Sequence, residues 1–267
     1  MSTSQDRDNP FAPPTAAVLE PAALGLGQYV PGGRKVPAGR GVAWFGEAWD
    51  LFKRSPGKWI VILIVFLLIS IVLAVVPLGS IVSNIITPVF TAGILIGCRT
   101  IEEGGSLEVG HLFAGFKTNA GPLLLLGVLY LVGMVLIAVV IGIITALVLP
   151  AFVGAAGLPS DFSGMMSMAP FIMLMVLLVL AAMLPLIMAL WFAPALVVFH
   201  DVQPMAAMRS SFEGCLKNFV PFLVYGVVGL LLAILAALPV GLGFLVLGPV
   251  IWCTIYTGYR DIFVQPA

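Results

Sequence analysis

Three long apolar stretches dominate the pattern of hydrophobic and polar positions along the chain. Residues 59–98 and 218–259 contain no charged side chain, and residues 118–199 contain only one, Asp161. A membrane-spanning helix needs about 20 apolar residues, so each stretch is long enough for two such helices. The pattern therefore predicts six transmembrane helices, at roughly 59–76, 81–98, 123–149, 170–198, 219–238 and 242–259.

Proline and glycine divide the stretches where the chain has to turn. Pro77-Leu78-Gly79 lies midway in the first stretch, and Pro239-Val240-Gly241 lies midway in the third. These residue types reverse the chain where its backbone groups can meet water. The middle stretch is divided by a longer loop from Pro150 to Met168. Each stretch is therefore expected to form a hairpin of two spans.

The basic residues predict how the hairpins are oriented. All 12 Lys and Arg residues lie before the first span, in the connections 99–117 and 200–217, or at Arg260. With six spans, all of these places lie on one face of the membrane, and the positive-inside rule makes that face cytoplasmic. Both termini are then expected to be cytoplasmic.

A short amphipathic segment precedes each stretch and indicates an internal repeat. In the first segment, the apolar residues Phe45, Ala48, Trp49 and Phe52 follow helical spacing. Such a helix suits the membrane interface. The predicted fold is therefore an all-α integral membrane protein, built from three similarly oriented units of an amphipathic helix and a hairpin. The units cover about 42–103, 104–201 and 202–263.

The segment before the first unit has a different composition. Residues 1–41 are rich in Pro, Gly and Ala and contain no long apolar run. Such a segment buries too little apolar surface to offset the entropy of ordering it. We therefore predict a disordered cytoplasmic tail over 1–41, followed by a membrane domain over 42–263.

Composition supports a membrane protein and argues against several functions. Hydrophobic residues make up 61% of the 267 positions and charged residues 9%, with a net charge of zero. The charged fraction is far below the value of about 25% that is typical of soluble domains. No basic domain indicates a nucleic-acid partner. No catalytic or metal-binding motif is present, so we expect neither enzymatic activity nor a cofactor.

Basic residues recur at the expected cytoplasmic boundary. Lys53, Lys117 and Lys217 end the three amphipathic segments, and Arg99 and Arg260 follow the second and sixth spans. These five residues are candidate contacts for anionic lipid head groups. The alternative is that they only determine the orientation of the chain in the membrane.

One group of polar residues lies within an expected span. Asn84 is accompanied by Thr87 and Thr91 on neighbouring helical turns. Such a group either binds a solute inside the membrane or bridges helices by hydrogen bonds. Ionisable residues are absent from the depth of the expected spans, which argues against an ion-coupled transporter.

Several segments resemble those of a known group of proteins. The carrying segments are Asn-Pro-Phe-Ala-Pro at 9–13, Trp-Asp-Leu-Phe-Lys at 49–53, Thr-Pro-Val-Phe-Thr-Ala-Gly at 87–93, Leu-Phe-Ala-Gly-Phe-Lys at 112–117 and Tyr-Arg-Asp-Ile-Phe at 259–263. Over about residues 42–263 the chain resembles an uncharacterised family of six-span bacterial inner-membrane proteins. It is also similar to the membrane domain of glycerophosphodiester phosphodiesterases, without their catalytic domain. The resemblance implies a bacterial inner-membrane location and no particular activity.

Two functional interpretations remain open. The first is a non-enzymatic scaffold that interacts with membrane lipids, or with a protein partner at the cytoplasmic face. The second is a conduit or carrier for a neutral or lipid-like solute along the axis of the repeat. The second interpretation predicts a cavity near Asn84 and Thr87. The sequence leaves the substrate, the partner and the oligomeric state open.

Overall fold

The structure is a computed structural model that describes residues 28–154, 166 and 168–265. Apart from one pair of short strands, the regular elements of this part of the chain are helices. In chain order they are β1 (Gln28–Tyr29), α1 (Arg40–Lys53), α2 (Pro56–Val75), α3 (Gly79–Glu102), the 3-10 helix η2 (Val109–Phe113), α4 (Ala114–Lys117), α5 (Ala120–Val153), α7 (Ala169–Trp191), α8 (Ala193–His200), α9 (Pro204–Lys217), α10 (Phe219–Ala237), α11 (Phe244–Phe263) and β2 (Val264–Gln265).

Five helical segments in the described residues are long and apolar enough to cross a membrane. They are Pro56–Val75, Gly79–Glu102, Ala120–Ala151, Ala169–His200 and Phe219–Ala237. The expectation of an all-α membrane protein with several spans is confirmed, but the count of six is not. The remaining long helix, α11, has 20 residues and carries Arg260 and Asp261 near its C-terminal end. It is not among the five candidate spans.

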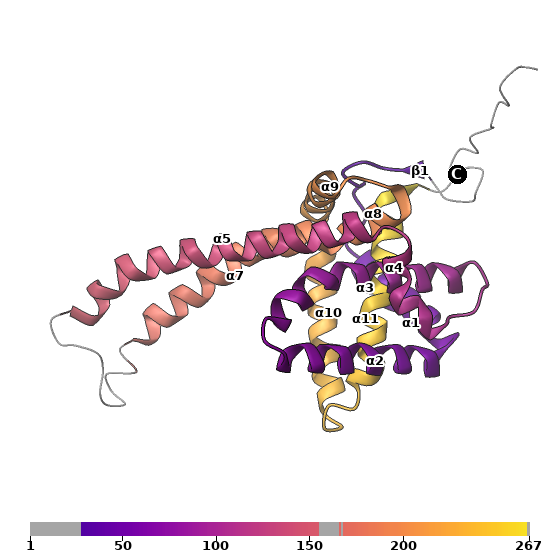
Figure 1. The fold of residues 1–267 in the computed structure, drawn as a ribbon, viewed down its shortest axis with the longest axis horizontal. Helices are drawn as coiled ribbons and strands as arrows, with labels where there is room; N and C mark the ends of the chain where they lie inside the picture. Colours follow the sequence, from indigo (N-terminus) through magenta and orange to yellow (C-terminus); the bar gives the residue numbers. More distant parts are fainter. Residues whose placement is uncertain (1–27, 155–165, 167, 266–267) are drawn as a thin grey trace, which may run out of the picture.

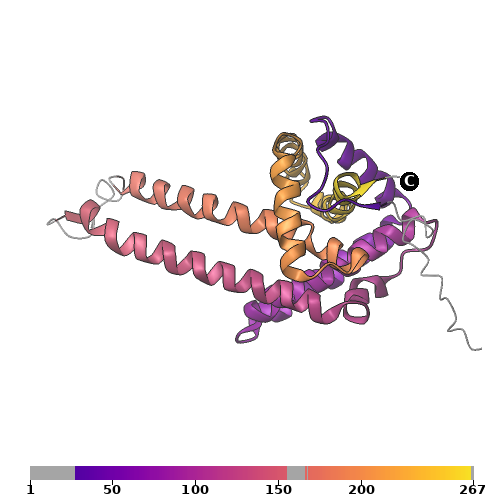
Figure 2. The ribbon, with the colours of Figure 1, turned by 90° about the horizontal axis from the view of Figure 1, so that it is seen from above.

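The long helices pair into three hairpins, α2 with α3, α5 with α7, and α10 with α11 (Figure 1). Pro77-Leu78-Gly79 and the segment around Pro239-Val240-Gly241 form the two tight turns, with positive φ angles of 61° at Leu78 and 55° at Val240. The α5–α7 hairpin extends away from the other helices in both views (Figures 1 and 2). The α10–α11 hairpin crosses the direction of the other two (Figure 1). The expected arrangement of three parallel units is therefore not confirmed.

The core lies where the hairpins converge. Its largest fully buried side chains include Trp44, Trp59, Leu95, Phe192 and Phe263. In the most apolar segment of α3, half of the residues are buried. In the corresponding segments of the other four candidate spans, at most 17% are buried. α3 is therefore the central helix of the fold, and the other apolar helices expose most of their surface, as expected of helices that face lipid.

A glycine allows α3 and α5 to approach each other closely. A Cβ atom at Gly127 would lie 2.1 Å from the backbone oxygen of Ile85. Real Cβ atoms do not approach backbone oxygens so closely, so a larger residue at position 127 would push the two helices apart. Small residues commonly permit such contacts between membrane helices.

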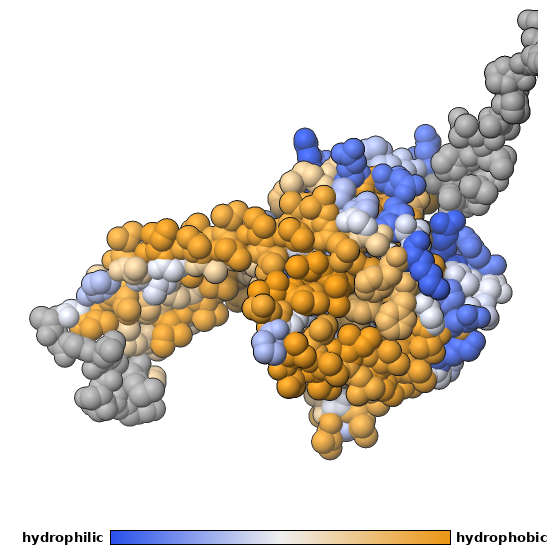
Figure 3. Space-filling view, in the orientation of Figure 1, coloured by the Kyte–Doolittle hydropathy of each residue, from blue (hydrophilic) through white to orange (hydrophobic). Residues whose placement is uncertain are grey.

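Hydrophilic residues gather at one end of the molecule. In Figure 3 they lie where α9 and β1 are placed in Figure 1 and continue down the right-hand side, whereas the hairpins are apolar. β1 pairs antiparallel with β2, with Tyr29 opposite Val264. The first and last described residues therefore lie together at this polar end. Which side of the membrane it faces stays a prediction.

The segment before α1 contacts the rest of the fold from Gln28 onward, and the expected tail over 1–41 stays a prediction. Residues 1–27 lie outside the described residues. Asn218 is fully buried and fixes this segment, because its Oδ1 accepts from the backbone N–H of Val36 and its Nδ2 donates to the oxygen of Arg34, both at 2.8 Å. We call residues 30–36 the N-terminal strap. These contacts come from the junction between α9 and α10, which is 182 residues from Val36 along the chain, so local composition did not reveal them.

Candidate functional site: a cavity between hairpins and a charged cluster

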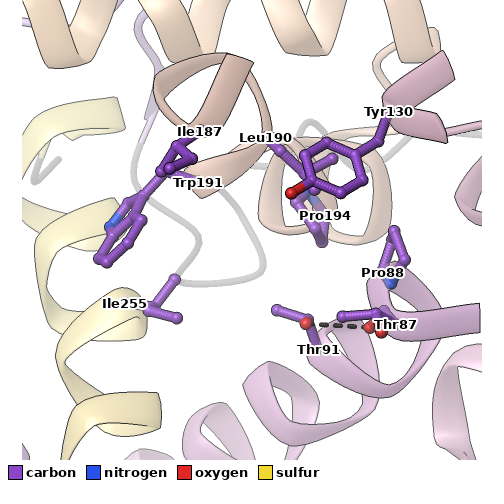
Figure 4. Close-up of a pocket in the computed structure, with 9 residues that line it drawn as sticks. All are labelled: Thr87, Pro88, Thr91, Tyr130, Ile187, Leu190, Trp191, Pro194 and Ile255. Atoms are coloured by element: carbon purple, nitrogen blue, oxygen red, sulfur yellow. Dashed lines mark hydrogen bonds between the residues drawn. The ribbon is translucent and has the colours of Figure 1, made fainter. Parts of the chain in front are cut away.

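A cavity of about 190 Å³ lies where all three hairpins contribute side chains (Figure 4). Its lining comes from α3, α5, α7, α8 and α11. The nine residues are Thr87, Pro88, Thr91, Tyr130, Ile187, Leu190, Trp191, Pro194 and Ile255. We call it the central cavity. It contains two of the three residues of the expected polar site, and none of the nine carries a formal charge at neutral pH.

Two prolines shape the helices around the central cavity. Pro88 lies inside α3, where it has no N–H to donate to the backbone oxygen of Asn84. Pro194 lies at the start of α8, directly after the interruption at Phe192 that separates α8 from α7. α3 continues unbroken through Pro88, whereas the interruption at Phe192 places irregular backbone near the cavity, which is where membrane proteins tolerate it.

The two threonine hydroxyls are hydrogen-bonded within α3. Thr87 Oγ1 donates to the oxygen of Ser83 at 2.7 Å, and Thr91 Oγ1 donates to the oxygen of Thr87 at 3.0 Å (Figure 4). A hydroxyl has one hydrogen and two acceptor lone pairs. Both oxygens can therefore still accept a hydrogen bond from a molecule in the cavity, but they have no hydrogen left to donate.

The third residue of the expected polar site lies elsewhere. Asn84 is half-buried, and its Nδ2 donates to the oxygen of Ser80 at 2.8 Å within α3. It is not among the residues that line the central cavity. The structure thus brings Thr87 and Thr91 to the cavity and leaves Asn84 beyond it.

A second cavity adjoins the first. It has a volume of about 270 Å³, and Ile187 and Trp191 line both. We call it the side cleft. Its lining residues come from α7, α9 and α10: Leu184, Ile187, Met188, Trp191, Cys215, Phe219, Phe222, Leu223 and Tyr225.

A cluster of charged residues lies at the polar end of the molecule. Its centre is Asp261 near the end of α11, whose carboxylate accepts from Arg34 Nη2 at 3.3 Å, Arg40 Nε at 2.5 Å and Trp44 Nε1 at 3.0 Å. The side chain of Asp261 is only 10% exposed. This carboxylate therefore joins the N-terminal strap, α1 and α11.

The cluster extends to α3 through Arg260. Its guanidinium pairs with Glu47 of α1 at 2.8 Å and with Glu102 of α3. Tyr256 also donates to Glu102, at 2.6 Å. We define the charged cluster as Arg34, Arg40, Glu47, Glu102, Arg260 and Asp261, whose formal charges cancel.

Internal pairing also determines the electrostatics of α1. Burial acts to lower the pKa of the Arg40 guanidinium, but its hydrogen bonds to Asp261 and Glu47 outweigh this effect and raise the pKa. Arg40 is therefore fixed as a cation between two carboxylates. A neutral network of this kind holds elements together and offers little net charge to an external ligand.

The five residues expected to contact lipid head groups lie in different environments. Arg99 pairs with Glu103 at 2.7 Å and lies over the ring of Phe199, and Arg260 belongs to the charged cluster. Both arginines therefore pair with acids at the C-terminal end of α3.

The three lysines are not brought together. Lys53 pairs with Asp50 at 2.9 Å, while Lys217 donates to the backbone oxygens of Gly32 and Gly33 at 2.9 and 3.2 Å. Lys117 is exposed, and no ion pair is found for it in the part of the chain that the structure describes. Of the five residues, Lys117 is thus the most available for a lipid head group.

Other site residues were not identified from the sequence. Tyr130 and Trp191 line the central cavity. Asp261 belongs to the charged cluster, and Trp44 donates a hydrogen bond to it. Asp261 lies in the Tyr-Arg-Asp-Ile-Phe segment, whose charges at the end of an apolar helix were the only available signal. Within the described ranges, no three His, Cys, Asp or Glu side chains gather as a metal site would require.

Comparisons with known proteins agree with the membrane architecture. A probable inner membrane protein of Burkholderia thailandensis is 29% identical over 255 residues, which cover 86% of this chain and 93% of that protein. No protein family profile and no solved structure matches the chain. The similarity to the membrane domain of glycerophosphodiester phosphodiesterases is not shown and stays a prediction. The apolar helices and this relative together place the chain among multi-pass inner-membrane proteins.

Proposed function

We propose that this chain is a non-enzymatic inner-membrane protein that binds a neutral, lipid-like molecule in the central cavity. The observation that carries the proposal is the convergence of three hairpins on a cavity whose lining is apolar apart from hydroxyl and indole groups. An apolar lining with a few directed polar groups is typical of small-molecule sites. A conduit or carrier role is the second candidate, favoured because the cavity lies between the hairpins rather than inside one of them.

The proposed topology has six spans, with α11 as the sixth. Gln28 and Gln265 face each other in the β1–β2 pair, so the chain returns to the end from which it starts. Such a return needs an even number of crossings, and five helices already qualify as spans. At about 1.5 Å per residue, the 20 residues of α11 are long enough to cross the hydrocarbon core. By the positive-inside rule, the polar end and both termini are cytoplasmic.

The proposed partners are membrane lipids and, at the cytoplasmic face, a protein. The charged cluster is neutral overall, so its arginines contribute little to attraction of anionic lipid. Exposed Lys117 and Lys53 remain as the head-group contacts of this proposal. The orientation of the chain follows from the same basic residues, so both roles assigned to them are compatible.

A cavity-filling variant tests the proposed function. The protein is purified in native lipid discs, transferred to mild detergent, and the retained lipid is quantified by mass spectrometry. Thr91→Phe fills the central cavity, whereas Val139→Phe adds a similar volume at a position that is 53% exposed on α5. We expect the first variant to lose most of the retained neutral lipid and the second to keep it. Equal retention by both folded variants would refute binding in the central cavity.

A further inference from the structure

The hydrogen-bonding state of α3 restricts what the central cavity can bind. Thr87 and Thr91 already donate within their helix and can only accept from a ligand. Asn84, one turn earlier on α3, is not among the lining residues, so the two threonine oxygens are the acceptors that α3 offers to the cavity. The polar part of a ligand that meets this face of α3 must therefore donate hydrogen bonds. Tyr130 and Trp191 elsewhere in the lining carry hydrogen-bond donors, so the lining as a whole suits a group that both donates and accepts, as an alcohol does.

The lining also disfavours an anionic ligand. A buried phosphate or carboxylate needs a positively charged partner, and the cavity lining contains no Lys, Arg or His. Burying an unpaired charge costs far more than burying a hydroxyl that finds acceptors. The polar part of the ligand is therefore uncharged.

The side cleft provides a place for a hydrocarbon chain. Its rim includes Leu184 and Leu223, which are 50% and 58% exposed on α7 and α10. Both helices are candidate spans, so this rim faces lipid acyl chains in a bilayer. A chain that enters here meets apolar side chains from three helices, and it reaches the wall shared with the central cavity.

Trp191 forms much of that wall. It is the last residue of α7, next to the interruption at Phe192. Its ring makes T-shaped contacts with Phe222 and Tyr225 of α10, with centroid distances of 6.2 and 6.1 Å. In Figure 4, Trp191 lies across the cavity from Thr87. Together with Ile187, this side chain thus separates an apolar compartment from one that offers hydrogen-bond acceptors.

We propose that the two compartments form a single site for an uncharged amphiphile with a hydroxyl head group, such as a monoacylglycerol. The head group binds beside Thr87 and Thr91, and the acyl chain lies past Trp191 in the side cleft. This assignment rests on the proposed function and specifies its ligand class. Trp191 is the residue that positions the junction between head group and chain.

Photolabelling of the purified full-length protein in lipid discs tests the assignment. The probe is a monoacylglycerol with a diazirine near the end of its chain, and the comparison is a lysophosphatidate with the same chain. Crosslinked residues are mapped by mass spectrometry. We expect monoacylglycerol to label residues of the side cleft at least tenfold more than lysophosphatidate does, and unlabelled monoacylglycerol to compete for this labelling.

Matched variants separate the cleft from the rest of the lipid-facing surface. Leu223→Trp fills the side cleft, whereas Leu230→Trp adds the same bulk at an outward position of α10 that is 62% exposed. We expect a loss of labelling of fivefold or more only for the first variant. Thr87→Val combined with Thr91→Val removes the acceptors with little change in shape, and it should reduce the preference for monoacylglycerol over lysophosphatidate.

The outcomes distinguish this inference from the proposed function. Equal labelling by the two probes would overturn the hydroxyl head-group assignment, and unchanged labelling in Leu223→Trp would overturn the side cleft as the chain site. In either case, the proposal that the central cavity binds a neutral lipid would still hold if Thr91→Phe loses its retained lipid. Retention of lipid by Thr91→Phe would remove the proposed function itself. Size-exclusion profiles and circular dichroism confirm that each variant is folded.

Discussion

Replacement of Asp261 by alanine tests whether the charged cluster holds the polar end together. The change removes the acceptor for Arg40, for Arg34 and for Trp44, whose side chain is almost fully buried. An unsatisfied buried donor costs about 1–3 kcal/mol, and a lost hydrogen bond to a charged group costs a similar amount. The contact with Arg34 adds little, because Arg34 is 41% exposed.

The expected total loss in the free energy of unfolding is therefore about 2–5 kcal/mol. Glu103→Ala is the control, because it removes an ion pair between Arg99 and an acid that is 59% exposed. That pair joins positions four apart on one helix, and such pairs contribute about 0.3–0.5 kcal/mol.

Unfolding of both variants in mixed micelles, followed by circular dichroism during titration with a denaturing detergent, measures the difference. Limited trypsin digestion adds a local measurement, because the side chains of Arg34 and Lys35 are already exposed and release of the N-terminal strap would free the backbone there for cleavage. A loss for Asp261→Ala that is no larger than the loss for Glu103→Ala would refute the assignment of Asp261 as the centre of the cluster. Asp261→Asn keeps the shape and one acceptor oxygen, and it provides a milder variant if the alanine variant does not fold.

Three further predictions concern other parts of the molecule. Gly93→Ala should lower the free energy of unfolding by about 1–3 kcal/mol, because the new Cβ would lie 2.4 Å from a backbone oxygen of η2, whereas Gly142→Ala meets no neighbour and should be neutral or slightly stabilising in the same assay. Lys117→Glu should weaken binding to vesicles containing anionic lipid, whereas Lys217→Glu should mainly increase trypsin cleavage of the N-terminal strap; equal effects of the two changes on vesicle binding would contradict this assignment. Burial raises the pKa of the Cys215 thiol to about 12, so in a variant with no other cysteine, maleimide labelling at pH 8 should be slow until the protein is unfolded.

The sequence determined the helical hairpins with good accuracy. The expected spans at 59–76 and 219–238 correspond to helices at Pro56–Val75 and Phe219–Ala237. The reason is physical: charged side chains are costly in hydrocarbon, so uninterrupted apolar runs reveal segments that can enter it. The Pro and Gly residues likewise indicated the positions of the turns, because their effect on the backbone is local. The amphipathic segment before the first hairpin also became a helix, α1, because its spacing alone specifies an apolar face.

Only part of the candidate site could be predicted from the sequence. Thr87 and Thr91 could be identified because polar residues are conspicuous in an apolar span. Tyr130 and Trp191 could not, since aromatic residues are common in membrane helices and nothing local indicates that they share a cavity. Asp261 likewise gave no indication that its partners lie more than 200 residues earlier in the chain.

The sequence by itself therefore determined which segments are apolar helices, where they turn and which of their residues could carry polar chemistry. Only the tertiary structure decided how the hairpins cross, that β1 meets β2, and that Trp191 stands between two compartments. Hydropathy and turn propensity are properties of neighbouring residues. The crossing of hairpins depends instead on close contacts between distant positions, such as Gly127 against the backbone of Ile85, which no local pattern encodes.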